Sequence, residues 1–288
     1  MPNIIAEHKT IGVVTDRFIQ PQTIGLLNAL SSQLNQHNCS LLLLNPASCE
    51  EYRVMLRRVM NDIDGLIFLA SDIDENFAFA QNIRPALAVT RIGNGDTSNT
   101  GNICVKGHDI GQQAAQLLVE QRFSRPGYMQ AHSGSLSPQM NGYAAFLESA
   151  QRPVKQWLTA GGYQRTDAYD AMQHYLKITW ASERVDALFC ESDELAFGAM
   201  QAVRDFGEGV HIGVVGVGDS DEAKSPTWHL TSFSLRYDLL AHEALNRLSG
   251  KSSDLCEDWR CAKLNIRRSH LSRVQMTEPV QCGCASRH

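Results

Sequence analysis

The chain has 288 residues, of which 43% are hydrophobic and 20% are charged, and these are ordinary proportions for a globular protein. Its formal net charge of -5 at pH 7 excludes a protein that holds DNA or an anionic membrane by bulk positive charge. No apolar run approaches the roughly 20 residues of a membrane span, and the first residues show no basic segment followed by a long apolar one. We therefore expect neither a secretory signal nor a membrane partner.

Short apolar runs alternate with helical patterns through the first third of the chain. "TIGVVT" and "SLLLLN" are continuous apolar runs of the kind that a strand buried on both faces requires, and leucines recur at helical spacing between them. Ser48 with Glu51 resembles a capping box, which predicts a helix start. The expected strands in this part are 10–15, 40–45, 65–70 and 85–91.

The same alternation then starts again, and two isolated strand-like pieces follow it. The expected strands are 103–105, 126–131, 155–160, 186–190, 211–217, 229–235 and 262–268. A helix is predicted between the last two, from about Tyr237 to Leu248. Strand–helix alternation implies parallel sheets with right-handed crossovers, so two blocks of it predict two doubly wound α/β lobes. Ligands bind such sheets at the carboxyl ends of the strands.

The sequence turns abruptly from apolar to polar within "VDALFCESDELAFGAM", at the end of the predicted strand 186–190. Ser192 or Asp193 can cap the helix that follows, and capping alone would explain an isolated corner of this kind. Because the corner is also a strand end, a ligand contact is the alternative.

A second helix start is predicted at Ser137-Pro138, since serine is a good N-cap and proline suits the first helical position. Free N–H groups there, with the hydroxyls of Ser133 and Ser135, could hold an anion or a polar ligand. An ordinary Ser/Gly loop explains the same residues.

The eight cysteines indicate reduced thiols rather than a disulfide framework. Cys104 and Cys190 lie in or beside apolar strand-like runs, where free cysteine behaves as a small hydrophobic residue. A large chain of this kind is expected in the cytoplasm. Cys282, Cys284 and His288 could ligate a soft metal, but their spacing matches no zinc pattern. We therefore expect no metal and a disordered tail over 274–288.

No motif indicates catalysis or a nucleotide cofactor. Gly213, Gly216 and Gly218 suggest a dinucleotide loop, but the third glycine of G-x-G-x-x-G is missing. The chain has no G-x-S-x-G elbow, no Walker A sequence and no H-E-x-x-H. The residue types of His132 and Ser133 would suit an acid–base pair, but a lone histidine near a strand end is more often a surface or hydrogen-bonded residue. No catalytic residue and no cofactor are predicted.

Taken in order, these segments resemble the effector domain of LacI/GalR-type bacterial repressors, with the type I periplasmic-binding-protein-like fold. The resemblance runs from about Lys9 to Ser272, and "DALFCESDELAFGAM" is its sharpest part. The other matching segments are "KTIGVV", "DGLIFLAS", "PALAVTR", "GQQAAQLLVEQ", "NGYAAF", "VVGVGDS", "LTSF" and "LNIRRS". Each segment alone is loose, and it is their order and spacing that carry the resemblance.

The resemblance implies two lobes joined by three crossovers, with a small ligand in the cleft between them. It divides the chain into a linker at 1–8, a first lobe at 9–102 plus 234–260, and a second lobe at 103–233 plus 261–273. The residues that it places at the ligand are Asp16, Phe18, Asp72 and Arg91 from the first lobe, Ser137, Gln139, Tyr163, Ser192, Asp193 and Asp219 from the second, and Tyr237 near a crossover. For Asp193, helix capping and hinge support are as good an explanation as ligand contact.

Three departures from the family bear on the ligand. Gln139 stands where the family has its cleft arginine, and Gly218, followed by Asp219, stands where it has the paired aspartate. The Asp-Asn pair that usually opens the second lobe's first helix reads Gly107-His108. Arginine and carboxylates grip sugar hydroxyls through charge-assisted bonds, so their loss argues against a simple neutral sugar.

Several neighbouring residues suit an anionic ligand such as a sugar phosphate. Lys106, Arg91, His108 and the serine-rich loop would supply positive charge and hydrogen-bond donors. The Gly-Asp pair and the "RRSHLSR" ending are also similar to the fructose- and trehalose-repressor branches, whose effectors are phosphorylated.

The resemblance favours the effector-sensing and dimerising part of a transcriptional repressor. Its effector would be a sugar, a sugar phosphate or a nucleoside, and it would form a homodimer through helices on which Ile24 and Leu27 are core or interface residues. The family carries a helix-turn-helix headpiece before its first core strand, and only nine residues precede Thr10 here. Operator DNA would therefore be bound through a headpiece that this sequence does not contain.

Two other classes of function stay open. A solute-binding protein for transport or chemoreception shares the fold, although the missing signal and the eight cysteines count against it. The other class is an enzyme with a doubly wound fold, but no set of catalytic residues supports it, and a fold alone does not establish a reaction.

Overall fold

A computed structural model of the chain describes most of its residues, and they form two compact units. The described residues are 9–15, 21–69, 79–80, 82–84, 88–93, 102–134, 137–207, 209–250 and 257–272, without the side chains of 21, 91, 93 and 102. Unit 1 comprises Met1–Gly111, Ser135–Gly142 and Phe233–Leu264, and unit 2 comprises Gln112–Gly134, Tyr143–Ser232 and Asn265–His288. The linker at 1–8 and the tail at 274–288 lie outside the described residues. The lobe boundaries implied by the resemblance stay a prediction.

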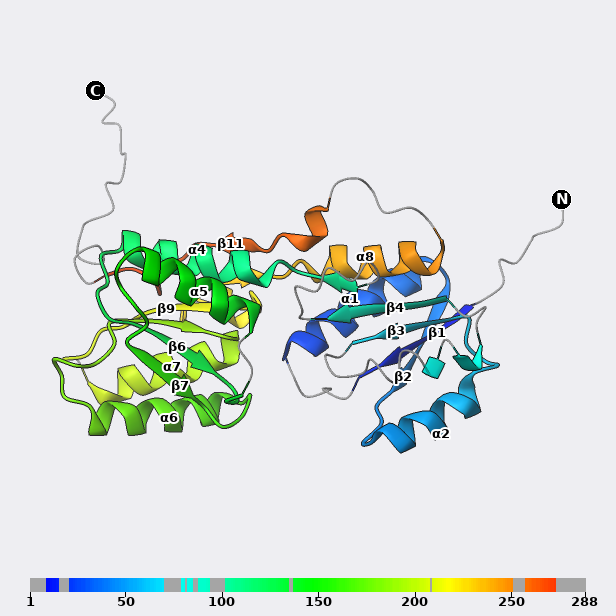
Figure 1. Ribbon diagram of the computed structural model, residues 1–288, viewed down its shortest axis with the longest axis horizontal. Coiled ribbons are helices and arrows are strands. Elements are labelled where there is room, and N and C mark those ends of the chain that lie inside the picture. Colours follow the sequence, from blue (N-terminus) through cyan, green and yellow to red (C-terminus); the bar gives the residue numbers. More distant parts are fainter. Residues whose placement is uncertain are drawn as a thin grey trace, which may run out of the picture. The chain divides into compact units, whose positions relative to one another are not determined.

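The first unit is built on a five-stranded sheet with the order β2-β1-β3-β4-β5 (Figure 1). Its strands are β1 (Lys9–Val14), β2 (Cys39–Leu44), β3 (Gly65–Phe68), β4 (Ala88–Gly93) and β5 (Asn102–Cys104). All four neighbouring pairs are parallel, and Val13 of β1 lies between Leu43 and Ile67 in the register. The apolar runs of the sequence are therefore strands with both faces covered.

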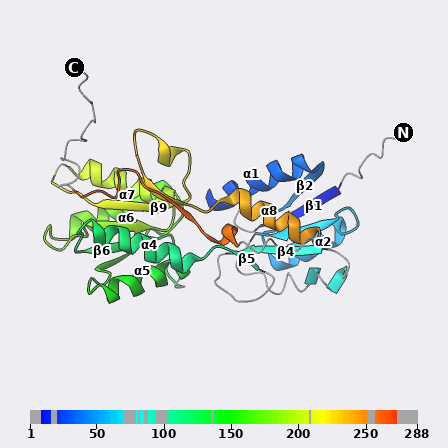
Figure 2. The ribbon, with the colours of Figure 1, turned by 90° about the horizontal axis from the view of Figure 1, so that it is seen from above.

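Helices cover both faces of this sheet. Helices α1 (Pro21–Gln36) and α8 (Tyr237–Leu248) lie side by side on one face, and α2 (Cys49–Val59) lies on the other (Figures 1 and 2). Ser48 caps α2, because its hydroxyl accepts a hydrogen bond from the N–H of Glu51 at 3.1 Å. The expected capping role of Ser48 is thus confirmed.

The second unit contains a six-stranded sheet with the order β11-β10-β9-β8-β6-β7. Its strands are β6 (Pro126–Gln130), β7 (Gln156–Thr159), β8 (Ala187–Cys190), β9 (Gly213–Val217), β10 (Thr231–Ser234) and β11 (Lys263–Asn265). The pairs β6–β7, β6–β8 and β8–β9 are parallel. Consequently the chain leaves β6, β7, β8 and β9 at one common edge, which we call the carboxyl edge.

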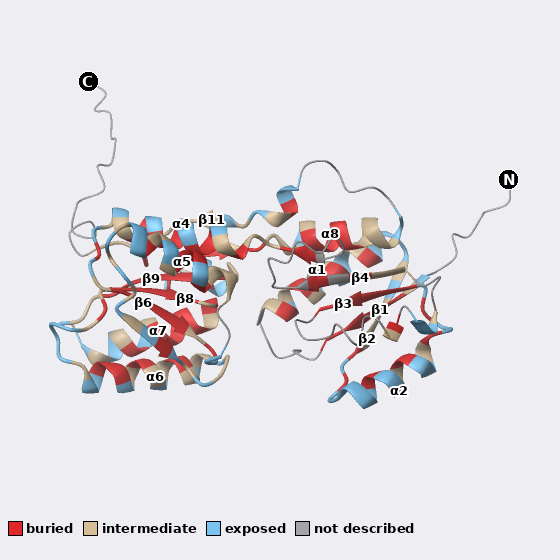
Figure 3. Ribbon diagram, viewed as in Figure 1, coloured by how far each residue is buried: buried red, intermediate tan, exposed pale blue. Residues whose placement is uncertain are grey.

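Four helices accompany this sheet, α4 and α5 on one face and α6 and α7 on the other (Figure 1). They are α4 (Gly107–Glu120), α5 (Pro138–Ser149), α6 (Arg165–Ile178) and α7 (Asp193–Phe206). The interior of the unit, where the strands run, is almost wholly buried (Figure 3). Tyr128, Tyr143 and Phe189 pack ring against ring there, with centroids 5.2 to 5.9 Å apart.

Two glycines allow pairs of helices to approach closely. A Cβ on Gly142 of α5 would lie 2.0 Å from the carbonyl oxygen of His108 in α4. A Cβ on Gly198 of α7 would lie 2.2 Å from the carbonyl oxygen of Arg165 in α6. Neither position has room for a larger residue without movement of a backbone.

The elements expected from the sequence are present among the described residues, and the predicted α/β architecture is confirmed. The helix expected at about 237–248 has those bounds. The expected strand 103–105 is shifted by one residue, to Asn102–Cys104, and the expected strand 262–268 is shorter than predicted, at Lys263–Asn265. Residues 70 and 85–87 of two other expected strands lie outside the described part. Ile24 is 46% exposed and Leu27 packs partly against the core, so the first lies at the surface and the second inside. No helix in the described part is long and apolar enough to cross a membrane.

Candidate functional site

The polar corner after β8 begins with a helix cap. The hydroxyl of Ser192 accepts a hydrogen bond from the N–H of Leu195 at 3.3 Å, and Ser192 has the extended backbone of an N-cap. Asp193 follows as the first residue of α7 and is only 4% exposed. The expected capping role of this corner is confirmed, and it belongs to Ser192 rather than to Asp193.

Both oxygens of the Asp193 carboxylate accept hydrogen bonds within its own unit. One oxygen accepts the N–H of Ser220 at 2.7 Å, and the other accepts the hydroxyl of Ser232 at 2.5 Å. Burial raises the pKa of Asp193, and these hydrogen bonds oppose the rise. A Cβ on Gly216 would lie 2.6 Å from this carboxylate, so the strand needs glycine to let it approach. Asp193 thus ties α7 to the ends of β9 and β10.

Asp219 is held in the same way at the end of β9. It has a positive φ of 50°, directly after Gly218 with a φ of 135°. Its side chain forms a 2.5 Å ion pair with Arg267 and accepts a 2.9 Å hydrogen bond from the amide of Asn265. The two side chains of the ion pair are 17% and 11% exposed, so the pair is largely shielded from water.

A hydrogen-bonded chain of side chains continues from this ion pair. The hydroxyl of Thr231 accepts the N–H of Arg267 at 2.8 Å and lies 2.8 Å from Nδ1 of His270. The hydroxyl of Ser269 accepts the N–H of Thr231 at 2.8 Å and donates to the carbonyl of Val214 at 2.6 Å. Burial lowers the pKa of His270. These bonds join β9, β10 and the segment after β11.

Further polar groups gather at the other strand ends of the carboxyl edge. The ring of Tyr163, which follows β7, meets the ring of His132, which follows β6, edge to face at 4.9 Å. The carboxylate of Glu191 accepts the N–H of Ala131 at 3.0 Å. The structure therefore brings Tyr163, Ser192, Asp193 and Asp219 to one edge of the second unit.

The starts of α4 and α5 lie against each other and form a second cluster of polar groups. Ser137 caps α5 by accepting the N–H of Met140 at 3.2 Å, which confirms the predicted helix start. Gln139 lies over Gly107 at the start of α4, since a Cβ there would lie 3.3 Å from the Gln139 amide carbon. Two helix N-termini therefore lie together, and the positive ends of their dipoles favour a negatively charged group.

The remaining expected residues belong to unit 1, and Tyr237 is the one whose side chain lies in the described part. Tyr237 begins α8, and its ring covers Gly25 of α1, where a Cβ would lie 2.6 Å from a ring carbon. Arg91 lies in β4, but its side chain is outside the described part. Asp16, Phe18 and Asp72 also lie outside it, as do Ser135 and the C-terminal Cys282, Cys284 and His288.

Sequence reasoning missed the partners that engage the two aspartates. Ser220, Ser232, Asn265 and Arg267 were not singled out, although all four bond to Asp193 or Asp219. They come from three separate segments, and Arg267 is 48 positions from Asp219. The signal that could have found Arg267 is an arginine in a strand-like piece, which needs an anionic partner when it is buried.

A family model covers most of the chain. The model for periplasmic binding proteins and the sugar binding domain of the LacI family matches residues 8–220. The chain belongs to this family.

Curated relatives and solved structures agree with this membership. The HTH-type transcriptional repressor PurR of Mannheimia succiniciproducens is 24% identical over 207 residues, which are 69% of this chain and 60% of that protein. PurR of Actinobacillus pleuropneumoniae serotype 5b is 23% identical over 250 residues, which are 83% of this chain and 73% of that protein. The LacI family transcriptional regulator from Lactobacillus casei with bound glucose has a TM-score of 0.72, 21% identity, and coverage of 91% of this chain and 99% of that one. The last comparison shows a shared fold.

Proposed function

We propose that this chain is the effector-sensing and dimerising domain of a LacI-type transcriptional regulator. Family membership supports sensing of a small ligand, and the curated relatives are transcriptional repressors. The proposed regulator works in the cytoplasm as a homodimer. Effector binding would shift the domain between conformations and so change the DNA affinity of a headpiece that is not part of these 288 residues. The proposed function is not enzymatic.

The effector that we propose is a sugar or a sugar phosphate, and the phosphorylated form fits better. The observation that carries this choice is the engagement of both aspartates. Asp193 and Asp219 each bond through their carboxylates to groups of their own unit, so a sugar hydroxyl would have to compete with partners that are already in place. Arg267 compensates the charge of Asp219, so an anionic ligand would meet less repulsion from that carboxylate.

Of the residues that the resemblance implies, the described ones that remain for the ligand are uncharged. Ser137 and Gln139 offer a hydroxyl and an amide in unit 1, and Tyr163 and Ser192 offer hydroxyls in unit 2. The starts of α4 and α5 add the positive ends of two helix dipoles. Lys106, which precedes α4, adds a positive charge. The contributions of Asp16, Phe18, Asp72, Arg91 and Tyr237 stay as the resemblance implies them.

Thermal melting with a small panel of compounds tests this function. The panel is glucose, glucose 6-phosphate, inorganic phosphate and adenosine, since a ligand of the native state raises the melting temperature in a concentration-dependent way. We expect a shift with the sugar phosphate that is reduced in Gln139→Ala. The matched control is Gln116→Ala, an exposed glutamine later in α4 that should leave the shift unchanged.

The outcomes separate the ligand classes. A shift with glucose alone would replace the anionic effector by a neutral one, and a shift with adenosine alone would replace it by a nucleoside. A shift with inorganic phosphate alone would show an anion site without sugar recognition. No shift with any compound would overturn the sensing function.

A further inference from the structure

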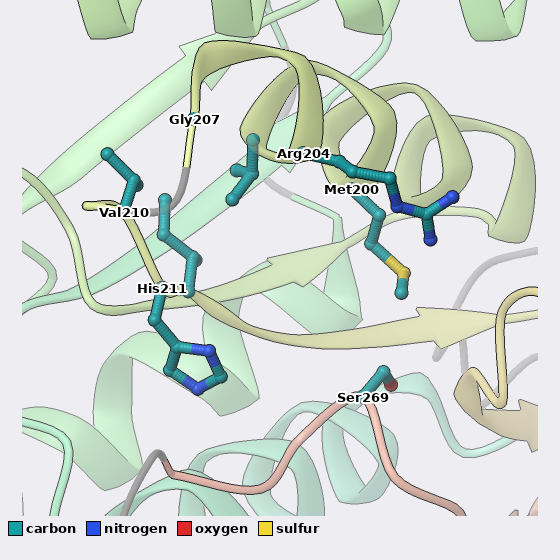
Figure 4. Close-up of a pocket in the computed structure, with 8 residues that line it drawn as sticks. Met200, Arg204, Gly207, Val210, His211 and Ser269 are labelled. Atoms are coloured by element: carbon teal, nitrogen blue, oxygen red, sulfur yellow. The ribbon is translucent and has the colours of Figure 1, made fainter.

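A hollow of about 360 Å³ opens on the second unit near the end of α7, far along the helix from the Ser192 cap (Figure 4). Its wall comes from the last turns of α7, from the segment before β9 and from the segment after β11 (Figure 4). The lining residues are Met200, Val203, Arg204, Gly207, Val210, His211, Ile212 and Ser269. Because β9 begins at Gly213, the hollow lies at the amino edge of the sheet and shares no residue with the site proposed above.

Most of the wall of this hollow is apolar. Met200, Val203, Val210 and Ile212 are buried or half-buried and present hydrocarbon or thioether surface. The hydroxyl of Ser269 already has hydrogen-bond partners, because it donates to the carbonyl of Val214 and accepts the N–H of Thr231. The wall therefore favours an apolar group, and the volume is within the range of about 300 to 1,000 Å³ that small-molecule pockets have.

One positive charge stands at this apolar wall. The guanidinium of Arg204 lies 4.9 Å over the ring of Trp228 and donates to the carbonyl of Thr227 at 3.2 Å. These two contacts fix the side chain but use only one of its five N–H donors. Arg204 forms no ion pair with any carboxylate in the described part of the chain. The charge that would complement it is a carboxylate, which arginine binds through two parallel hydrogen bonds.

The ring of His211 is held at the same wall. Its Nε2 donates to the carbonyl of Leu271 at 2.9 Å, which orients the ring and joins the segment after β11 to the segment before β9. Two of the three sides of the hollow are therefore tied together by a hydrogen bond.

We propose that this hollow binds a small molecule with an apolar body and a single carboxylate, such as an aliphatic or aromatic acid. The apolar body lies against Met200, Val203 and Val210, and the carboxylate pairs with the guanidinium of Arg204. This is a second ligand site in addition to the effector site, and it stands whether or not the proposed function is correct.

Titration of the full chain with hexanoate tests the proposal, with the ¹³C-labelled methyl group of Met200 as the reporter in NMR. We expect a saturable shift of this signal. Arg204→Gln should weaken hexanoate by about tenfold or more, because a hydrogen bond to a charged group contributes about 1.5 kcal/mol or more. Hexan-1-ol, which has the same apolar body without the charge, should bind wild type more weakly than hexanoate by a similar factor.

The control variant is Arg58→Gln, which removes an exposed arginine from the last turn of α2 just as Arg204→Gln removes one from the last turn of α7. It should leave the titration unchanged, as should Gln139→Ala. Equal binding of hexanoate to Arg204→Gln and wild type, equal binding of hexan-1-ol, or no shift at millimolar hexanoate would each overturn the proposal. Loss of sugar binding in Gln139→Ala with hexanoate binding retained would show that the two sites are separate.

Discussion

Replacement of Arg267 by methionine probes the ion pair that holds Asp219. Methionine keeps much of the length of the side chain but leaves the carboxylate of Asp219 with only the amide of Asn265. Loss of one partner from a buried pair costs about 3 to 5 kcal/mol, and the exposed fractions of 17% and 11% let water compensate in part, so we expect about 3 kcal/mol. The variant also loses the hydrogen bond from Arg267 to the carbonyl of Leu230.

Calorimetry and urea unfolding measure this loss. For a unit of this size each kcal/mol lowers the melting temperature by about 2 to 4 °C, so about 3 kcal/mol corresponds to a fall of about 6 to 12 °C. The two units can melt separately, and we expect the transition of unit 2 to move while that of unit 1 stays. Arg268→Met is the matched control, because Arg268 is the exposed neighbour of Arg267 in the same segment.

The double variant Asp219→Asn with Arg267→Met separates an unpaired charge from lost packing. Without a carboxylate no buried charge is left, so the double variant should recover a large part of the lost stability. A loss in Arg267→Met within about 0.5 kcal/mol of Arg268→Met, which is the size of an ordinary surface change, would refute the buried ion pair. A double variant as unstable as the single one would show that packing by Arg267, and not its charge, stabilises the segment.

Three further changes have defined outcomes. Gly142→Ala should lower the free energy of unfolding by about 2 kcal/mol or more through its clash with the carbonyl of His108, whereas Gly209→Ala, with nothing within 4 Å, should be near neutral; equal effects in urea unfolding would contradict the close helix contact. Because the folded state lowers the pKa of His270, the free energy of unfolding should fall as pH falls below about 6.5, where the histidine of the unfolded chain takes up a proton. Urea unfolding at several pH values measures this dependence, and His270→Gln should make it flatter. Because the folded state raises the pKa of Asp193, stability should fall as pH rises from about 3.9 through the raised pKa, and Asp193→Asn should remove this fall; an unchanged slope would refute the buried carboxylate.

The sequence predicted the elements well because each depends on neighbours in the chain. A continuous apolar run such as 40–45 must be covered on both faces, which requires a parallel sheet between helices. The caps at Ser48, Ser137 and Ser192 depend on a residue three positions later, so the pattern is visible in the letters. The helix over Tyr237–Leu248 was found with its bounds for the same reason.

The candidate site was harder to predict because its polar residues depend on distant partners. Asp193 and Asp219 follow strands, and a polar residue at a strand end indicates a ligand contact whenever its partner is unknown. In the structure their partners are Ser232, Asn265 and Arg267, which are 39 to 48 positions away. No local pattern distinguishes a carboxylate that waits for a ligand from one that is already paired.

This pairing changes which residues can select an effector. A buried carboxylate that already has partners can accept a sugar hydroxyl only through its remaining lone pairs or after it loses a partner, and loss of one partner from a buried ion pair costs about 3 to 5 kcal/mol. A hydrogen bond to a charged group returns only about 1.5 to 3 kcal/mol, so exchanging these bonds for a ligand contact is unfavourable. Selection therefore depends more on groups such as Gln139 and Tyr163, which lie against a glycine and an aromatic ring rather than against an opposite charge. Substitution of either group should change which compound binds, whereas substitution of Asp219 should change stability first.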